Sequence, residues 1–356
     1  MAFVSFKNIR LSGLSAAVPK KVVENAENTK FPADDIQKFM DATGVQRFRM
    51  AEDDVCTSDL CYVAADKLLN ELKWDRNEVE MLLFISQGPD YILPNTAPIL
   101  QEKLKLPKTC IAFDMTLGCS AYVYGLSVVA SMMSAGTIKK ALFLCGDVTT
   151  KNSNKKDPST AMLFGDAGTA TALEYDTTAG EMQFSLGSDG SGYDSIIVPY
   201  GAARNSLNTV DRANYALQEE VGTDGITRNK SHLILDGMNV FSFGITHAPA
   251  SVKETTTYFN EDPAKIDFYV FHQANLMMNE IVRRKLKLSK EKVPYSLKNF
   301  GNTSSASVPL TVITEIREEL TDTDKTMLFC GFGVGLSWGS CIVKTKNLVI
   351  PELIEV

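Results

Sequence analysis

The sequence is poor in the residues that build metal centres and disulfide frameworks. Its 356 residues include three histidines and seven cysteines, and no two cysteines form a Cys-x-x-Cys pair or stand with histidines at zinc-ligand spacing. An odd number of irregularly spaced cysteines predicts neither a structural metal nor a set of disulfides. Both expectations suit a protein of the reducing cytoplasm.

The chain also lacks an excess of basic residues. It has 36 Lys and Arg against 43 Asp and Glu, a net charge of -7, which argues against nucleic acid as a partner. Residues 115–138 carry no charge and are long enough to cross a bilayer, but their serines, threonines and glycines favour a helix enclosed in a globular core. Lys7 and Arg10 interrupt the apolar start of the chain, which predicts a first strand rather than a signal peptide. We therefore expect no membrane segment.

Two parts of the chain repeat the same pattern of a buried strand, a helix and a Lys-Leu-Lys-Leu stretch. Short apolar runs that end in glycine follow in both parts, which is typical of strands covered on both faces. The repeated segments are 80–88, 101–108 and 141–147 in the first part and 266–274, 283–290 and 327–333 in the second.

The repetition predicts an α/β protein of two similar halves, 1–175 and 176–356, with mixed, mostly parallel sheets. Chance similarity between ordinary α/β segments is the alternative. Residues 187–231 are rich in Gly, Ser, Asn and Asp, and we expect them to form loops and short elements at the surface, where binding residues are often found.

Cys119 stands where a predicted strand ends and the long uncharged helix begins. The free N–H groups and the dipole at a helix start favour a thiolate, which makes Cys119 a candidate nucleophile. A buried structural cysteine is the alternative.

Three further features accompany Cys119. His272 follows the apolar strand 268–271 and precedes a helix, so it stands at the ligand-binding edge of a parallel sheet. Asn302 follows Gly301 in a turn, and the glycine-rich stretch 330–339 allows backbone N–H groups to approach a ligand. Each feature also has an alternative interpretation without a catalytic role. His272 could be a core histidine, Asn302 an ordinary turn residue and the stretch 330–339 a tight turn between two strands. Together they supply a nucleophile, two neutral hydrogen-bond donors and an oxyanion hole.

This set of motifs resembles the beta-ketoacyl-acyl-carrier-protein synthase III family of the thiolase superfamily. The resemblance extends over nearly the whole chain, because the motifs occur in the order that the family shows. They are residues 43–47, the Cys119 loop, 164–168, 271–275, 301–304 and 332–338.

The resemblance implies a duplicated thiolase-like fold of five layers (αβαβα), a homodimer, and decarboxylative Claisen condensation in fatty-acid initiation or a specialised pathway. Cys119 would carry the acyl group, and the backbone N–H groups of Cys119, Gly333 and Val334 would bind the oxyanion. His272 and Asn302 would stabilise the enolate formed from a malonyl thioester. The acyl thioester of carrier protein or coenzyme A enters as substrate, so no cofactor is expected.

Several positions depart from the family pattern. Lys38, Ala42, Pro158 and Met277 stand where relatives clamp the coenzyme A nucleotide, which indicates a donor other than acetyl-coenzyme A. Leu93 stands where an aromatic residue of the partner subunit closes the acyl pocket in many relatives, so we expect a longer or bulkier acyl group.

Other predicted contacts follow the family pattern. Phe164, Phe241 and Phe332 are expected to line the acyl pocket. Arg284 and Lys285 match basic positions that dock the acyl carrier protein.

Two alternatives share the same motifs. The acyl group on Cys119 could pass to an oxygen or nitrogen nucleophile or to water instead of carbon. The chain could also be a catalytically inactive subunit that binds carrier protein.

Overall fold

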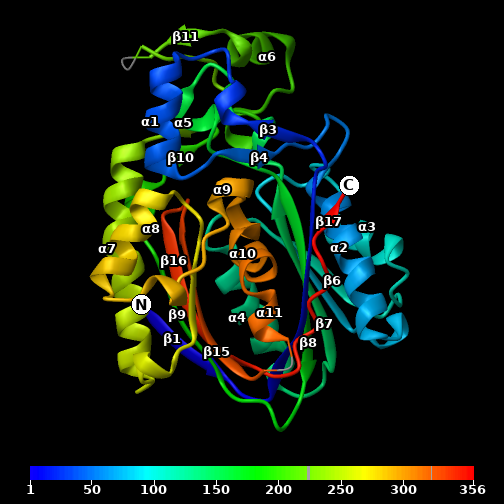
Figure 1. Cartoon of the computed structure of the whole chain (residues 1–356). Coiled ribbons are helices and arrows are strands. Elements are labelled where there is room, and N and C mark those ends of the chain that lie inside the picture. The colour runs from blue at the N-terminus through cyan, green and yellow to red at the C-terminus, as the bar shows by residue number, and fades with distance from the viewer. Residues whose placement is uncertain (223–224, 322) are drawn as a thin grey trace.

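The computed structural model describes residues 1–222, 225–321 and 323–356, and its centre is a pair of β-sheets (Figure 1). The first sheet has six strands in the order β17-β2-β8-β7-β5-β6. All of them except β8 run in the same direction, as the parallel pairs β17–β2, β7–β5 and β5–β6 and the two antiparallel pairs of β8 require. Its strands are β2 (Ile9–Val18), β5 (Met81–Ile85), β6 (Ile111–Met115), β7 (Lys140–Asp147), β8 (Ala167–Tyr175) and β17 (Ile354–Glu355).

The second sheet has five strands in the order β1-β9-β16-β15-β14. β14 and β15 are parallel, and the other three neighbouring pairs are antiparallel. Both sheets are therefore mixed, as predicted, but only the first is mostly parallel; the prediction of a mostly parallel sheet was wrong for the second, in which one of the four strand pairs is parallel. The strands of the second sheet are β1 (Ala2–Phe6), β9 (Met182–Ser188), β14 (Phe268–Phe271), β15 (Lys325–Gly333) and β16 (Ser337–Thr345).

Helices separate and cover the sheets in five layers, which confirms the predicted architecture (Figure 1). α4 and α10 lie between the sheets, and their apolar side chains share one core with residues of both. α2 and α3 cover the outer face of the first sheet, and α7 and α8 cover the outer face of the second. These helices are α2 (Thr57–Leu72), α3 (Thr96–Lys103), α4 (Ala121–Ser134), α7 (Gly237–Tyr258), α8 (Leu276–Lys285) and α10 (Ser307–Glu315).

The central position of α4 explains its composition. Both sheets pack against it, so a charged side chain on any face would lose water without gaining a partner. Within the described residues, no helix has the length and hydropathy that a membrane span requires. The uncharged run 115–138 is therefore a core element, as predicted.

The two predicted halves exchange their terminal strands. The chain passes from the first sheet to the second between β8 and β9, close to the predicted seam. However, β1 pairs with β9 in the second sheet, and β17 pairs with β2 in the first. The division into 1–175 and 176–356 stays a prediction, and each sheet contains one strand from the other segment.

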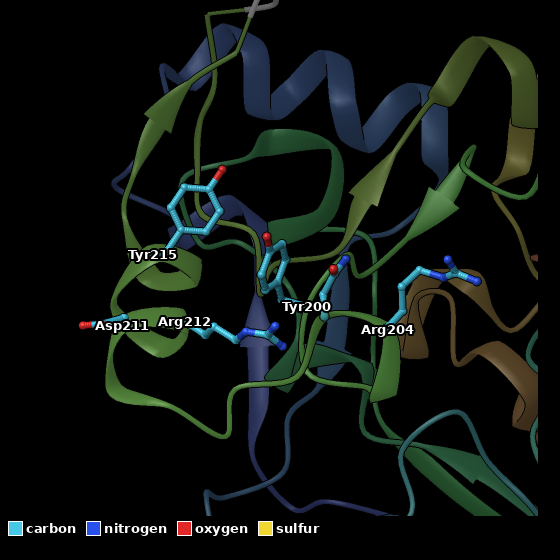
Figure 2. A pocket seen from close by; sticks show the side chains of 6 residues that line it. Tyr200, Arg204, Asp211, Arg212 and Tyr215 are labelled. Atoms are coloured by element: carbon cyan, nitrogen blue, oxygen red, sulfur yellow. The ribbon is translucent and has the colours of Figure 1, made fainter.

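A lobe of short elements lies at one end of the sheets, next to α1, α5, β3 and β4 (Figure 1). The lobe agrees with the prediction that residues 187–231 form loops and short elements at the surface. The lobe contains a cavity of about 290 Å³ between Tyr200 and Tyr215, and Figure 2 shows Arg212 pointing below Tyr200 and Asp211 pointing away. None of the predicted site residues lines this cavity. The remaining elements are α1 (Ala33–Thr43), α5 (Pro158–Ala161), α6 (Val210–Leu217), α9 (Leu297–Phe300), α11 (Arg317–Leu320), β3 (Val22–Glu24), β4 (Arg47–Arg49), β10 (Ile196–Ile197), β11 (Glu220–Val221), β12 (Thr227–Arg228) and β13 (Ile234–Leu235).

Candidate active site

Cys119 lies in the loop between β6 and α4, where it faces the end of β15. A Cβ atom added to Gly333 would be 2.6 Å from both the Cβ and the Sγ of Cys119, and Gly333 has a φ of +154°. The position therefore requires glycine. The backbone N–H groups of Val334 and of Cys119 itself lie near the sulfur and lower the pKa of the thiol. Two of the predicted oxyanion-hole amides thus lie at the nucleophile, and Gly333 permits their close approach.

Two opposing effects set the pKa of the Cys119 thiol. Burial raises the pKa of the Cys119 thiol to about 11, and the negative charge of Asp147 adds to this effect. The nearby backbone groups of Val334 and Cys119 and the side chain of Ser304 lower this pKa, but their combined effect is smaller than that of burial. The N–H group at the helix start lowers the pKa of the thiol, as predicted, but desolvation of the sulfur outweighs this effect, so the thiol is protonated in the free protein.

His272 immediately follows β14 and is only 1% exposed. The backbone N–H group of His272 donates to the Cys330 carbonyl at 2.8 Å, which extends the pairing of β14 with β15. The Nδ1 atom lies 2.7 Å from the Ser307 hydroxyl. Burial lowers the pKa of His272 to about 3, although the Ser304 backbone partly opposes this shift. The imidazole is therefore neutral at physiological pH and can act as a hydrogen-bond donor without carrying charge.

Asn302 follows α9 and Gly301, whose φ of +63° turns the chain towards Phe164. The Asn302 N–H group donates to the Leu163 carbonyl at 2.9 Å. Its Oδ1 atom accepts from the Ser304 N–H at 2.9 Å. This bond orients the carboxamide and leaves its NH₂ group as the hydrogen-bond donor. Nδ2 donates to the Ala274 carbonyl at 3.5 Å.

Ser304 contacts all three predicted catalytic residues. Its side chain lowers the pKa of the Cys119 thiol, its backbone raises the pKa of His272, and its N–H group donates to Asn302 Oδ1. Cys119, His272 and Asn302, which are distant in the sequence, therefore surround a single residue. This arrangement provides a nucleophile, a neutral imidazole and an oriented carboxamide in one site.

Sequence reasoning gave no role to four residues around this centre. Ser304 belongs to a motif that carries the family resemblance, and Asp147 ends a strand that the repeat predicts. Their sequence neighbours gave no sign that residues at the ends of β5 and β7 and at the start of α10 meet around Cys119 and His272. The four residues are Gln87, Asp147, Ser304 and Ser307.

The predicted pocket residues divide into two groups. Phe164 pairs with Asn302, and the Phe332 ring meets the His272 ring edge-on with 5.6 Å between centroids. Phe241 on α7 packs against the apolar cluster that contains Phe332. Leu93, in contrast, is 81% exposed on the loop between β5 and α3. The single chain thus places the Phe332 ring beside His272 and the Phe164 backbone beside Asn302, and it leaves Leu93 exposed.

The two predicted docking residues lie on α8, away from the catalytic centre. The Arg284 side chain is 72% exposed and lies 3.6 Å from a Glu280 carboxylate oxygen. The Lys285 ammonium donates to the Ile245 carbonyl at 2.9 Å. Among the residues that the structure describes, no group of His, Cys, Asp and Glu has the geometry of a metal site.

We predict that Gly333→Ala slows acylation of Cys119 by about two orders of magnitude, because the added methyl group displaces the sulfur. Protein mass after incubation with an acyl thioester measures this rate. Gly190→Ala is the control, since a Cβ at Gly190 has no neighbour within 4 Å. An acylation rate in Gly333→Ala equal to that of the control would contradict the close approach.

Comparison with known proteins gives a consistent result. The sequence models of the 3-oxoacyl-[acyl-carrier-protein] synthase III family and of its C-terminal region match residues 113–190 and 260–345. A putative 3-oxoacyl-[acyl-carrier-protein] synthase 3 of Campylobacter jejuni is 32% identical, with 98% of this chain and 97% of that protein covered.

Solved structures agree with the sequence comparison. The 3-oxoacyl-(acyl-carrier protein) synthase of Burkholderia xenovorans has a TM-score of 0.92 at 35% identity, and the match covers 100% of this chain and 99% of that chain. The 3-oxoacyl-(acyl carrier protein) synthase III of Pseudomonas aeruginosa has a TM-score of 0.81 at 27% identity, with 97% and 100% covered. The chain therefore belongs to the beta-ketoacyl-acyl-carrier-protein synthase III family, whose members are also named 3-oxoacyl-acyl-carrier-protein synthases.

Proposed function

We propose that this protein is an acyltransferase that joins an acyl group on Cys119 to a malonyl thioester by decarboxylative Claisen condensation. The observation that carries this proposal is the convergence of the Cys119 thiol, the neutral His272 imidazole and the oriented Asn302 carboxamide around Ser304. The product is a beta-ketoacyl thioester, made either in fatty-acid initiation or in a specialised pathway.

The first half-reaction loads Cys119. Its sulfur attacks the carbonyl carbon of the donor thioester, and the N–H groups of Cys119 and Val334 stabilise the tetrahedral oxyanion. The bond between the carbonyl carbon and the donor sulfur then breaks, and the proton lost by Cys119 ends on the departing thiol. Because burial disfavours the free thiolate, we assign deprotonation to the time of attack rather than to the resting protein.

The second half-reaction needs donors that tolerate new negative charge. The malonyl thioester loses carbon dioxide, and its thioester oxygen becomes an enolate oxygen that accepts from His272 and Asn302. The enolate carbon then attacks the acyl group, and Cys119 leaves as a thiolate that takes up a proton. Neutral donors suit this step, since their hydrogen bonds strengthen only as the enolate charge appears. Ser307 engages Nδ1 of His272, so Nε2 is the ring nitrogen assigned to the enolate.

The acyl donor is proposed to be an acyl carrier protein. The four positions at which relatives hold the coenzyme A nucleotide have no guanidinium group here: Lys38 is on α1, Pro158 begins α5, and Met277 is half-exposed on α8. Ala42, the fourth, is also on α1. The exposed guanidinium of Arg284, with Lys285 beside it, offers cations to an acidic partner on an otherwise acidic protein.

The functional unit is proposed to be a homodimer. Three consecutive apolar side chains, Tyr91, Ile92 and Leu93, are strongly exposed on one loop, and the edge strand β6 begins with the exposed Ile111. A second copy that covers this loop would receive Leu93 at its own acyl pocket. There a side chain smaller than an aromatic ring leaves room for a long acyl group. Light scattering should then give twice the 39.1 kDa chain mass, and a monomer would refute the proposal.

A cytoplasmic location and the absence of a cofactor remain predictions.

A donor screen tests the proposed function and its alternatives. The protein is incubated with acyl groups of increasing length on carrier protein or on coenzyme A, and its intact mass is measured. We expect acyl mass from carrier-bound donors and release of carbon dioxide when malonyl-carrier protein follows. Acyl mass without carbon dioxide release would favour transfer to oxygen, nitrogen or water. No acyl mass from any donor would favour an inactive binding subunit.

The same screen includes Arg284→Glu. We expect this variant to raise the KM for carrier-bound donors by about tenfold, as loss of an attractive contact to an acidic partner should, and to leave coenzyme A donors unaffected. Lys67→Glu, on α2 in the opposite outer layer, is the control for the charge change. Equal effects of both variants on the carrier-bound donor would contradict docking at α8.

A further inference from the structure

A network of hydrogen bonds centred on a buried carboxylate lies next to the Asn302 turn, and the proposed mechanism does not use it. The carboxylate belongs to Asp147, at the end of β7. Its Oδ1 atom accepts from the Ser86 hydroxyl at 3.0 Å and from the Gln87 backbone N–H at 2.8 Å. Its Oδ2 atom accepts from the Ser305 hydroxyl at 2.8 Å and from the Ser305 N–H at 3.3 Å. Asp147 therefore connects the residues that follow β5 to the segment that follows Asn302.

The Gln87 side chain closes this network into a ring. Its Nε2 atom donates to Ser304 Oγ at 2.9 Å. A Cβ atom added to Gly118 would be 2.7 Å from both Cδ and Oε1 of Gln87, so the carboxamide lies against the backbone one residue before Cys119. Gln87 thus contacts two loops, the one that carries the nucleophile and the one that carries Asn302.

Ser304 connects the ring to the Asn302 side chain. Its N–H group donates to Asn302 Oδ1 at 2.9 Å, and this bond orients the carboxamide. The direction of that N–H group depends on an unusual backbone conformation, because Ser304 is buried and has a φ of +50°, which serine adopts only at an energetic cost. Such a conformation persists only where surrounding contacts hold it. Here the Gln87 amide binds the Ser304 hydroxyl oxygen, and the Asp147 carboxylate binds the next residue.

We propose that Gln87 is a positioning residue for the condensation step. It holds Ser304, and thereby the Asn302 carboxamide, in the orientation that receives the enolate charge. Asp147 is the acceptor that fixes the Gln87 backbone for this task. This inference rests on the proposed function, in which Asn302 donates to the enolate oxygen. No proton passes to or from Gln87, so its effect on the reaction is one of geometry.

A loosely held Asn302 should affect one half-reaction and not the other. Its NH₂ group binds the enolate oxygen more strongly as negative charge develops, so loss of orientation should lower kcat for condensation and leave the KM for the malonyl donor unchanged. Loading of Cys119 depends on backbone N–H groups and should continue at the wild-type rate. A general loss of structure would slow both half-reactions.

Gln87→Ala tests the proposed role. Gln87 is the exposed member of the ring, so its truncation opens no buried cavity. We expect kcat for condensation to fall about tenfold, which corresponds to the loss of one ordinary hydrogen bond, with an unchanged rate of acyl loading. Gln37→Ala is the matched control, because Gln37 is an exposed glutamine of α1 that donates to Asp41 at 2.9 Å. A wild-type kcat in Gln87→Ala would overturn the proposal, and so would an equal loss of loading.

A double-mutant cycle links the effect to Asn302. In the Asn302→Ala background, Gln87→Ala should slow condensation no further, because the side chain that Gln87 positions is absent. Effects that multiply would show that Gln87 acts independently of Asn302, against its assignment as a positioning residue.

Ser304→Gly tests the route from Gln87 to Asn302. Glycine accepts the positive φ without strain but offers no hydroxyl oxygen to the Gln87 amide. We expect this variant to slow condensation by the same factor as Gln87→Ala, and the two changes together should slow it no further. A wild-type condensation rate in Ser304→Gly would overturn the route through the Ser304 hydroxyl.

Amide hydrogen exchange gives a readout that needs no substrate. The bond to Asn302 Oδ1 protects the Ser304 N–H group, so residues 302–306 should exchange about tenfold faster in Gln87→Ala, while α4 exchanges as in the wild type. Unchanged exchange of residues 302–306 would overturn the proposal even if the donor screen finds no substrate. Faster exchange in a protein that releases no carbon dioxide would instead show that the proposed reaction is wrong and that Gln87 still holds Asn302.

Discussion

Cys119→Ala is expected to gain no acyl mass from any donor and to form no beta-ketoacyl product. The effect is complete because no other described cysteine lies at the N–H groups of Val334 and Cys119 that stabilise the oxyanion. Intact mass after incubation with acyl-carrier protein measures loading, and product mass measures condensation.

The control for this loss is Cys56→Ser. Cys56 is the N-cap of α2, where serine is a preferred residue, so the variant should fold and load like the wild type. Undiminished loading of Cys119→Ala would show that another nucleophile carries the acyl group, and the proposed mechanism would fail.

His272→Ala and Asn302→Ala are expected to load normally and to condense about two to three orders of magnitude more slowly, as removal of one oxyanion donor commonly does. Loading should continue because the Cys119 oxyanion is bound by backbone N–H groups and not by these side chains. The two rates are separated by measuring acyl mass before malonyl-carrier protein is added and carbon dioxide release afterwards.

The pH dependence gives a second readout for His272. Burial lowers the pKa of His272 to about 3, so the ring is already neutral well below neutral pH and should remain a neutral donor as the pH rises. The condensation rate should therefore show no step near the ordinary histidine pKa of about 6.5. His232→Asn, in the surface lobe, is the control for loss of a histidine.

A different outcome would contradict the division of labour between the two half-reactions. If Asn302→Ala loses loading to the same extent as condensation, Asn302 acts in both steps.

The sequence predicted the architecture and the identities of the converging residues for clear physical reasons. Apolar runs that end at Cys145 and Cys330 are typical of central strands, and His272, directly after the apolar run of β14, lies at the carboxyl end of that strand. The order of the motifs supplied the rest, because the family resemblance depends on several short patterns and not on one.

What the sequence could not predict depends on contacts between distant segments. The thiol pKa follows from how much water the folded chain removes from Cys119, and no local pattern reports this quantity. Ser304 and Asp147 gain their importance only when the ends of β5 and β7 meet the Asn302 segment. The exposure of Leu93 depends on whether a second copy of the chain covers its loop.

The exchange of terminal strands between the two sheets has a consequence for synthesis. Residues 17 and 18 pair with residues 354 and 355 of β17, which are made long after them. A ribosome-bound nascent chain therefore cannot complete its first sheet until β17 has emerged. Termination before β17 leaves that sheet with an unpaired edge at β2, to which strands of other unfinished chains can add.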